Sequence, residues 1–229
     1  MCGRYTLTVA WPELEKRFLG REANLPAGKD WQPRFNAAPG QNLPVVLQGK
    51  DGRDIQLLKW GLVPVWAKDP SVGFKTINAR SETVDEKPSF RQAFRARRCL
   101  VPVDSFYEWQ REGKVKIPQR IFPEHGVDDS PGHSPVFSLA GIWENGTFSL
   151  LTRESDPGMA KLHDRMPVLL EPEDEDFWLS TPAKESGKLK EWLAQAPRPR
   201  HWWWFPVSTQ LNSGRLEGPE LVRRDANST

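Results

Sequence analysis

Five strand-like segments in the middle of the chain most strongly limit the folds that this sequence can adopt. Each is short and rich in β-branched or aromatic residues, and turn-forming residues separate most of them. The last two are joined through Asn145-Gly146, which favours a tight turn between antiparallel strands. We predict that these segments form the antiparallel centre of an α+β fold, curled into a sheet or a barrel-like core with several short peripheral helices. They are residues 99–103, 106–110, 117–122, 136–142 and 148–152.

The flanking sequence alternates between short strands, short helices and irregular stretches. The helical segments are recognised by apolar residues at every third or fourth position and the strands by short runs rich in apolar residues. The predicted strands are 3–7, 43–47, 55–60, 168–170 and 202–207. The predicted helical segments are 11–19, 88–96, 159–163, one that starts at Pro172, and 188–194. The predicted irregular stretches are the ordered loop 21–42, the shaped loop 60–68 and the exposed insertion 123–134.

The length of 229 residues is enough for one sizeable core but short for two separate domains. We predict a single domain over residues 1–222 and a disordered tail over 223–229. The start of the chain lacks the continuous apolar region of a signal peptide, and no stretch approaches the roughly 20 apolar residues of a membrane span. These features predict a cytoplasmic protein without a membrane partner.

Charge and composition exclude several classes of function. The net charge of +2 is too small to indicate a nucleic-acid partner by itself, so any anion-binding surface must be local. Cys2 and Cys99 are too few for a disulfide framework, and without other soft ligands they make no zinc site. We expect neither a metal nor an organic cofactor. Eleven tryptophans supply flat rings for core packing or for stacking on bases.

Cys2 follows Met1, which a methionyl aminopeptidase readily removes when the next residue is small. The mature chain would then begin with a 1,2-aminothiol, whose amine titrates at about 7.7–8 and whose thiol titrates at about 8.5 in peptides. An aldehyde is the matching electrophile. Attack by the amine gives a Schiff base, and the thiolate then closes a thiazolidine ring in a fast intramolecular step. The alternative is that Cys2 is a small buried residue at the start of a strand.

A Cys2 that captures an aldehyde needs groups that move protons and donors that hold the substrate. Glu108 lies between aromatic residues in a predicted strand, where burial would raise its pKa; alternatively it faces solvent. His163 could transfer protons near neutral pH, or it could be a structural histidine bonded to a neighbouring carboxylate or carbonyl. Asn78 and Asn36 could supply amide groups, or they could form turns.

Six short blocks of sequence occur between residues 1 and 167. They are Met-Cys-Gly-Arg-Tyr, Phe-Asn-Ala-Ala-Pro, Trp-Gly-Leu-Val-Pro-Val-Trp, Ile-Asn-Ala-Arg-Ser-Glu-Thr, Asp-Ser-Phe-Tyr-Glu-Trp and His-Asp-Arg-Met-Pro. Together they resemble the SRAP family, the SOS-response-associated peptidase domain, and they stand in the family's order. One block would be a weak signal, but six in order are specific. Residues 205–208 and 218–221 resemble its C-terminal part, which residues 211–215 match only loosely.

The resemblance implies that the chain senses and shields abasic sites in single-stranded DNA. It would do so through a covalent thiazolidine between Cys2 and the ring-opened deoxyribose aldehyde. In that reaction Asn78 would position the amine and the sugar, Glu108 would transfer protons during ring opening and closure, and His163 would assist formation and reversal of the Schiff base. A chain that retains Met1 would be an inactive precursor.

The same resemblance implies a DNA path lined by Arg4, Asn36, Trp66 and Arg80, with cations on phosphates and an aromatic ring under a base. Pro39 would help to hold the strand kinked at the lesion. The implied partner is single-stranded DNA that contains abasic sites, including those at junctions with duplex. The protein would be a monomer that associates with the nucleoid when it is bound to damaged DNA.

Three functions remain open on the sequence alone. The first is a crosslinking enzyme, with a weak strand-cleaving lyase reaction through the Schiff base. The second is a cysteine-type peptidase that removes Met1, with Cys2 as the nucleophile and His163 as the base. The third is a non-covalent single-strand-binding module that uses tryptophans and arginines while Cys2 is structural. The arginine cluster 91–98 could extend a phosphate path or simply be a solvated helix face.

Overall fold

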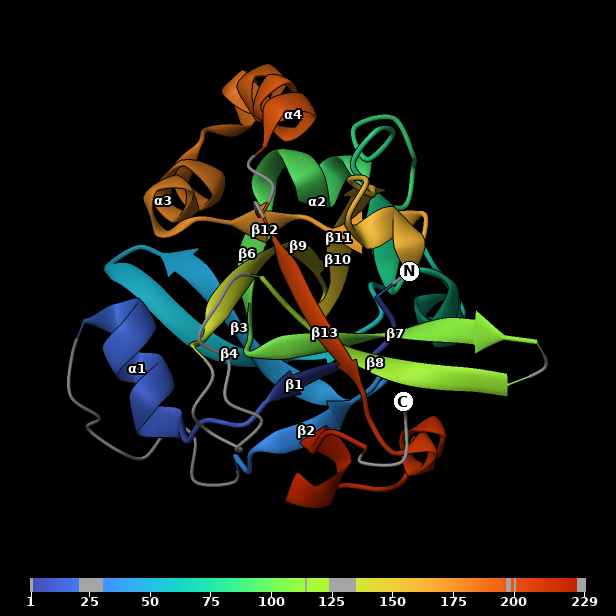
Figure 1. Cartoon of the computed structure of the whole chain (residues 1–229). Helices are drawn as coiled ribbons and strands as arrows, with labels where there is room; N and C mark the ends of the chain where they lie inside the picture. Colours follow the sequence, from blue (N-terminus) through green and yellow to red (C-terminus); the bar gives the residue numbers. More distant parts are fainter. Residues whose placement is uncertain are drawn as a thin grey trace.

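The computed structural model describes residues 2–20, 31–113, 115–123, 135–196, 199 and 201–225. The predicted α+β fold is confirmed, because two β-sheets form the body and short helices surround them (Figure 1). Most of the predicted insertion 123–134 lies outside the described residues, as do residues 21–30. The predicted tail 223–229 is described only as far as Asp225.

The larger sheet closes on itself as a barrel. Each of β10, β4, β3, β6 and β9 pairs with the next, and β9 pairs back to β10. A ring of five strands cannot alternate in direction throughout, so β10 runs parallel to β4; it also runs parallel to β5. The predicted antiparallel core is confirmed, because the other strand pairings described in this sheet are antiparallel. The strands are β3 (Asn42–Gly49), β4 (Gly52–Trp60), β5 (Asn78–Arg80), β6 (Arg98–Val103), β9 (Phe137–Glu144), β10 (Thr147–Glu154), β11 (Arg165–Pro167) and β12 (Leu169–Leu170).

The turn predicted at Asn145-Gly146 is confirmed. Both residues have positive φ angles, 51° and 68°, and Glu144 pairs directly with Thr147 across the turn. Two consecutive left-handed residues match the right-handed twist of the strands that they join. This turn therefore fixes the register of β9 and β10, the two strands that close the barrel.

The smaller sheet carries the N-terminus of the chain. Its strands are β13 (Trp202–Pro206), β8 (Val115–Pro123), β7 (Ser105–Glu112), β1 (Tyr5–Leu7) and β2 (Arg34–Ala37), all antiparallel in this order. β2 lies in the stretch that was predicted to be a loop, which was wrong there. β2 has only four residues, Arg-Phe-Asn-Ala, a run too short for its polar–apolar alternation to identify it as a strand. Its pairing is with β1, which is distant in the chain, and the register shifts between Tyr5 and Leu7.

The helices pack outside the sheets, with α2, α3 and α4 gathered at one end of the molecule and α1 on another side (Figure 1). The predicted helix 11–19 is confirmed as α1, which buries Trp11, Leu14 and Phe18 on one face. None of the helices in the described part of the chain is long and apolar enough to cross a membrane. The helical segments are α1 (Trp11–Leu19), η1 (Pro70–Lys75), α2 (Arg91–Ala96), η2 (Met159–Lys161), α3 (Pro172–Ser180), η3 (Ala183–Glu185), α4 (Ser186–Gln195), η4 (Thr209–Asn212) and η5 (Pro219–Val222).

The C-terminal segment, defined as residues 208–222, covers one face of the smaller sheet. There a second hydrophobic cluster joins Tyr107 and Phe122 of the sheet to Leu211 and Leu221 of the segment. The other face of the sheet turns toward the main core, where Phe106 and Ile121 are buried. The smaller sheet is therefore sandwiched, and the site described below lies along β7.

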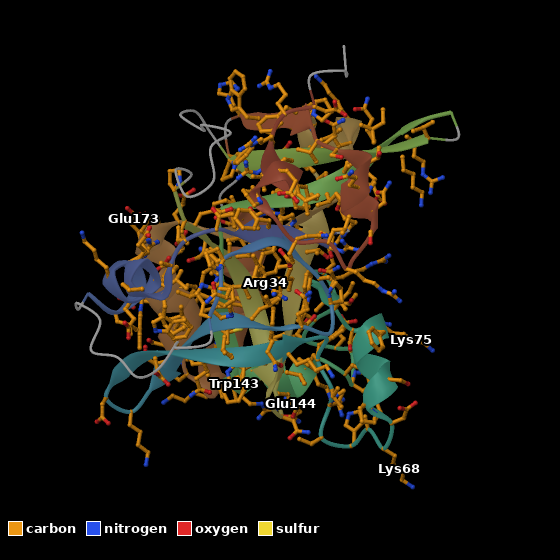
Figure 2. The ribbon with its side chains drawn as sticks, turned by 90° about the horizontal axis from the view of Figure 1, so that it is seen from below. Arg34, Lys68, Lys75, Trp143, Glu144 and Glu173 are labelled. Atoms are coloured by element: carbon orange, nitrogen blue, oxygen red, sulfur yellow. The ribbon has the colours of Figure 1, made fainter. Side chains whose placement is uncertain are left out.

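The stretch 60–68 forms the shaped loop that the sequence predicted. Gly61 has a φ of 121°, and a Cβ atom at this position would lie 2.6 Å from the backbone oxygen of Gly73. Only glycine allows this close approach of the loop to η1. Beyond it, the side chains of Lys68 and Lys75 point outward from the body (Figure 2).

Candidate active site

The four residues predicted to be catalytic come from four separate segments and meet beside β7. Cys2 precedes β1, Asn78 begins β5, Glu108 lies in β7 and His163 follows η2. The Asn78 Nδ2 atom donates a hydrogen bond of 2.8 Å to the carbonyl oxygen of Cys2. Glu108 and His163 line one cleft of about 480 Å³. β1 pairs with β7 at Tyr5 and Phe106, which brings the start of the chain close to Glu108.

Cys2 has no exposed surface, and its thiol contacts the carbonyl oxygen of Arg4 at 3.8 Å. Burial raises the pKa of the Cys2 thiol well above its usual range, and the neighbouring Glu108 carboxyl raises it further. The thiol is therefore protonated at neutral pH and a poor first nucleophile. The two sequence interpretations of Cys2 are therefore compatible, because the residue is buried and also lies beside Asn78 and Glu108.

Glu108 is buried, with 3 % of its surface exposed. Burial raises the pKa of its carboxyl above the ordinary value, while a positive amino terminus and His163 offset part of this rise. The prediction that Glu108 is buried rather than facing solvent is therefore confirmed. A carboxyl with a raised pKa keeps its proton to higher pH and can donate it to a reacting oxygen.

The Nδ1 atom of His163 lies within hydrogen-bonding distance of one donor, the Arg165 amide, and of one acceptor, the Asp164 carboxylate. Its Nδ1 atom accepts a hydrogen bond of 2.9 Å from the amide of Arg165 and lies 2.8 Å from Oδ1 of Asp164. In the neutral ring the nitrogen that accepts this bond carries no proton, so the proton resides on Nε2. A protonated ring would instead donate from Nδ1 to Asp164. Both charge states of His163 therefore have a partner, as a proton-transfer group requires.

Asn78 presents an unsatisfied acceptor at the centre of the site. Its Oδ1 atom is buried and accepts no hydrogen bond from the residues that the structure describes. A buried amide oxygen without a donor costs about 1–3 kcal/mol. An N–H or O–H group of a ligand, or a free amine at Cys2, would supply that donor.

Arg4 and Asn36, predicted to line the DNA path, bind the C-terminal segment. Arg4 donates to Oδ1 of Asn36 at 2.6 Å and to the carbonyl oxygen of Leu211 at 3.2 Å. The Asn36 amide donates to the carbonyl oxygens of Ser213 and Leu216 at 3.1 and 3.0 Å. Asn36 is fully buried. In this conformation its side chain faces the C-terminal segment, so its contact with DNA stays a prediction.

Arg80, Trp66 and Pro39 lie in different places relative to this centre. Arg80 is exposed and lines a second cleft of about 680 Å³, which continues past Asp164. Trp66 is 59 % exposed and Pro39 is half-buried, and neither lines either of the two clefts. Arg80 shares the short strand β5 with Asn78, but its cleft contains none of the four predicted catalytic residues. The DNA-binding roles of all three residues stay predictions.

Sequence reasoning missed several residues that shape the two clefts. Arg165 donates two hydrogen bonds, of 2.7 and 2.8 Å, to the Glu82 carboxylate. Both residues stand inside blocks that were recognised, but their separation in the chain leaves no local pattern. Asn212 lines the first cleft from the C-terminal segment. Within the described part of the chain, no group of three or more His, Cys, Asp and Glu side chains is placed to hold a metal ion.

Comparison with known proteins assigns the chain to a family. The sequence profile of SRAP, described as SOS response associated peptidase, matches residues 1–214. Two Bacillus subtilis proteins named abasic site processing proteins, YoqW and YoaM, are 36 % and 39 % identical to the chain over 232 residues. The matches cover 97 % of this chain and 99 % and 97 % of those proteins. The chain therefore belongs to the SRAP family.

The likeness extends to animal proteins and to solved structures. The abasic site processing protein HMCES of Xenopus tropicalis is 30 % identical over 268 residues, a match that covers 97 % of this chain and 78 % of HMCES. A phage-related protein from Bordetella bronchiseptica shares the fold with a TM-score of 0.68 at 26 % identity, over 91 % of this chain and 95 % of its own. A Bacteroides thetaiotaomicron protein gives a TM-score of 0.78 at 24 % identity, over 98 % and 100 % of the two chains. At that identity it shows the fold alone.

Proposed function

We propose that this protein processes abasic sites in single-stranded DNA by forming a covalent thiazolidine crosslink through Cys2 once Met1 has been removed. The observation that carries the proposal is the convergence of Cys2, Asn78, Glu108 and His163 from four segments upon one region beside β7. The relatives named as abasic site processing proteins support the choice of substrate.

The buried thiol indicates the order of the two bond-forming steps. The α-amine of Cys2, with a pKa of about 7.7–8 in peptides, attacks the aldehyde carbon of the ring-opened deoxyribose first. The resulting carbinolamine loses water and becomes a Schiff base. The thiol then adds to the imine carbon, and its proton ends on the ring nitrogen. One water is released in total, and the second step is fast because both nucleophiles belong to one residue.

The neighbouring side chains fit the proton transfers that these steps need. Glu108, whose pKa is raised by burial, donates a proton to the sugar oxygen during ring opening and to the departing hydroxyl of the carbinolamine. His163 accepts and returns protons during formation and reversal of the Schiff base, and the same Schiff base could permit a weak lyase reaction. The Oδ1 atom of Asn78 accepts a hydrogen bond from the free amine, which orients its lone pair toward the sugar.

The proposed partner is single-stranded DNA, including abasic sites next to duplex junctions. The protein would act on it as a monomer with a single domain, in the cytoplasm or on the nucleoid. Sequence preference should be low, because aldehyde capture reads a missing base and the backbone rather than base edges. A peptidase reaction at Met1 has weaker support, because the raised pKa of the Cys2 thiol disfavours a thiolate that would attack an amide.

Protein that has lost Met1 is expected to form a heat-stable adduct with a single-stranded oligonucleotide that contains one abasic site. Denaturing electrophoresis should show it at the combined mass, and mass spectrometry should show the loss of one water. The matched control is the same oligonucleotide after borohydride has reduced its aldehyde to an alcohol, which should give no adduct. Protein that retains Met1 should also give none. An equal adduct from Met1-retaining protein would contradict the proposal.

Glu108→Gln is expected to slow adduct formation by about 100-fold or more, because the side chain can no longer donate or accept a proton. The pH dependence of the rate of adduct formation tests this role of Glu108. The amine must lose its proton, so the rate first rises with pH. The acid form of Glu108 is lost as pH rises through its raised pKa, so the two requirements together give a bell-shaped profile. In Glu108→Gln only the rising limb should remain in single-turnover rates. Glu191→Gln, at an exposed position on α4, should keep both limbs.

A further inference from the structure

Two cations lie opposite each other across the β7–β8 hairpin. Arg111 of β7 pairs in register with Lys116 of β8, so their side chains share one face of the sheet. Both are exposed, and neither forms an ion pair with the side chains that the structure describes. Like charges directly opposite each other destabilise an antiparallel pair. An anion held between the two side chains would remove that repulsion.

The pair belongs to the active-site cleft. Arg111 and Lys116 line the same cleft of about 480 Å³ as Glu108 and His163. Glu108 and Arg111 are three positions apart in β7 and project from opposite faces of the strand, so a ligand that contacts both must follow the shared cleft from one face to the other. The two cations and the position of the reacting atom share one cleft. The group that the cations would bind is therefore one that is covalently attached to the reacting sugar.

Asn212 adds a third donor to the same cleft. The Trp109 Nε1 atom donates a hydrogen bond of 2.6 Å to Oδ1 of Asn212. Because an indole nitrogen only donates, this bond fixes which end of the amide is oxygen. The Nδ2 group of Asn212 is left to donate, and it has no partner among the residues described. The cleft thus offers a guanidinium, an ammonium and an oriented amide, which are donors that suit phosphate oxygens.

The second cleft, which is lined by Asp164 and Arg165, has balanced charge. Arg165 in it already makes two hydrogen bonds to Glu82. The first cleft contains two cations, and its carboxyl, that of Glu108, has a pKa raised by burial, which favours the neutral form. The excess positive charge is therefore in the first cleft. The charged residues of the second cleft are the cations Arg80, Lys87 and Arg165 and the carboxylates Glu82, Glu154 and Asp164.

We propose that Arg111, Lys116 and Asn212 form a subsite for one phosphodiester group of the bound strand, adjacent to the sugar that Cys2 captures. The inference rests on the proposed function, because its ligand is the abasic strand. The subsite positions the sugar between Glu108 and His163 without reading sequence, since phosphate contacts carry no base information.

Equilibrium binding of a non-reacting strand tests the subsite. The full chain carrying Cys2→Ala is titrated into a labelled single strand that contains tetrahydrofuran, an abasic analogue without an aldehyde, over a series of salt concentrations. Adding Arg111→Gln and Lys116→Gln is expected to weaken binding about tenfold at low salt. The slope of log affinity against log salt should fall by about 0.7, the value for one phosphate on a single strand. Thermal unfolding confirms that the variants are folded.

A matched pair of substitutions controls for net charge. Lys16→Gln with Lys184→Gln removes the same number of positive charges from exposed positions that line neither cleft, and its salt slope should stay at the parent value. Equal slopes for the parent and for the cleft variant would overturn the subsite, as would equal losses in both pairs of substitutions.

A neutral methylphosphonate, placed in turn at each phosphate beside the lesion, locates the contact. One position should weaken binding to the parent chain but cause no further loss in the Arg111→Gln/Lys116→Gln variant, because both changes remove the same contact. Additive losses at every position would overturn the subsite. Adduct formation by the mature wild-type chain is measured in parallel. Failure of that adduct would refute the proposed function, whereas a normal adduct with unchanged salt slopes would refute the subsite alone.

Discussion

Cys2→Ala is expected to lose the heat-stable adduct with abasic single strands, with a yield at least about 100-fold below that of the wild type. Alanine is as permissive as cysteine for removal of Met1, so the variant keeps a free α-amine and loses only the thiol. The amine can still form a Schiff base, but water reverses it during heating. The difference between the two proteins therefore isolates the ring-closing step, which the intramolecular thiol makes fast and stable.

Borohydride distinguishes the intermediates in this comparison. It should trap Cys2→Ala as a stable secondary amine with the strand, while the untreated sample shows no adduct. Cys99→Ala is the matched control, because Cys99 is an equally buried cysteine in β6 whose thiol pKa burial also raises. It should crosslink like the wild type. An unchanged heat-stable adduct from Cys2→Ala would refute the thiazolidine. If borohydride failed to trap Cys2→Ala, the amine that forms the Schiff base would not be the α-amine of residue 2.

Local patterns in the sequence predicted most of the fold. The helix 11–19, the strands 43–47 and 55–60 and the five central strands were found because each has its own periodicity or turn residues. β2 and β5 were missed, since strands of four and three residues gain their hydrogen bonds from partners that are distant in the chain. Barrel closure depends on the pairing of β10 with β4, and its parallel direction follows from a five-stranded ring rather than from any local pattern.

The candidate site was predictable to the extent that its residues stand in recognisable blocks. The bond from Asn78 to Cys2 and the burial of Glu108 agree with positions that the family resemblance singled out. The C-terminal segment was not predictable in this way. Arg4 reaches Leu211 across 207 positions of the chain, and neither residue has a local signature of that contact. Residues such as Asn212, which enter the cleft only through that segment, were consequently missed.

The position of Cys2 depends on how β1 is held, and a buried charge cluster around Asp104 holds it. The Asp104 carboxylate accepts hydrogen bonds from the Thr6 hydroxyl and from both the amide and the hydroxyl of Thr8. The Arg120 guanidinium of β8 lies 3.9 Å from it, and both side chains are completely buried. Arg120 also donates to the carbonyl oxygen of Val222 at 3.1 Å. The cluster therefore joins β1 to β8 and to the C-terminal segment.

Asp104→Ala is expected to lower the free energy of unfolding by about 3–5 kcal/mol, because it leaves the Arg120 charge buried without this carboxylate. That is a large share of the roughly 5–15 kcal/mol that stabilises a typical domain. Urea unfolding followed by tryptophan fluorescence measures the change. The double variant Asp104→Ala/Arg120→Met should regain part of the loss, since a buried apolar side chain needs no counter-charge. If the double variant were no more stable than Asp104→Ala, the uncompensated charge would not be the cause. The loss would then come from the hydrogen bonds to Thr6 and Thr8 that fasten β1.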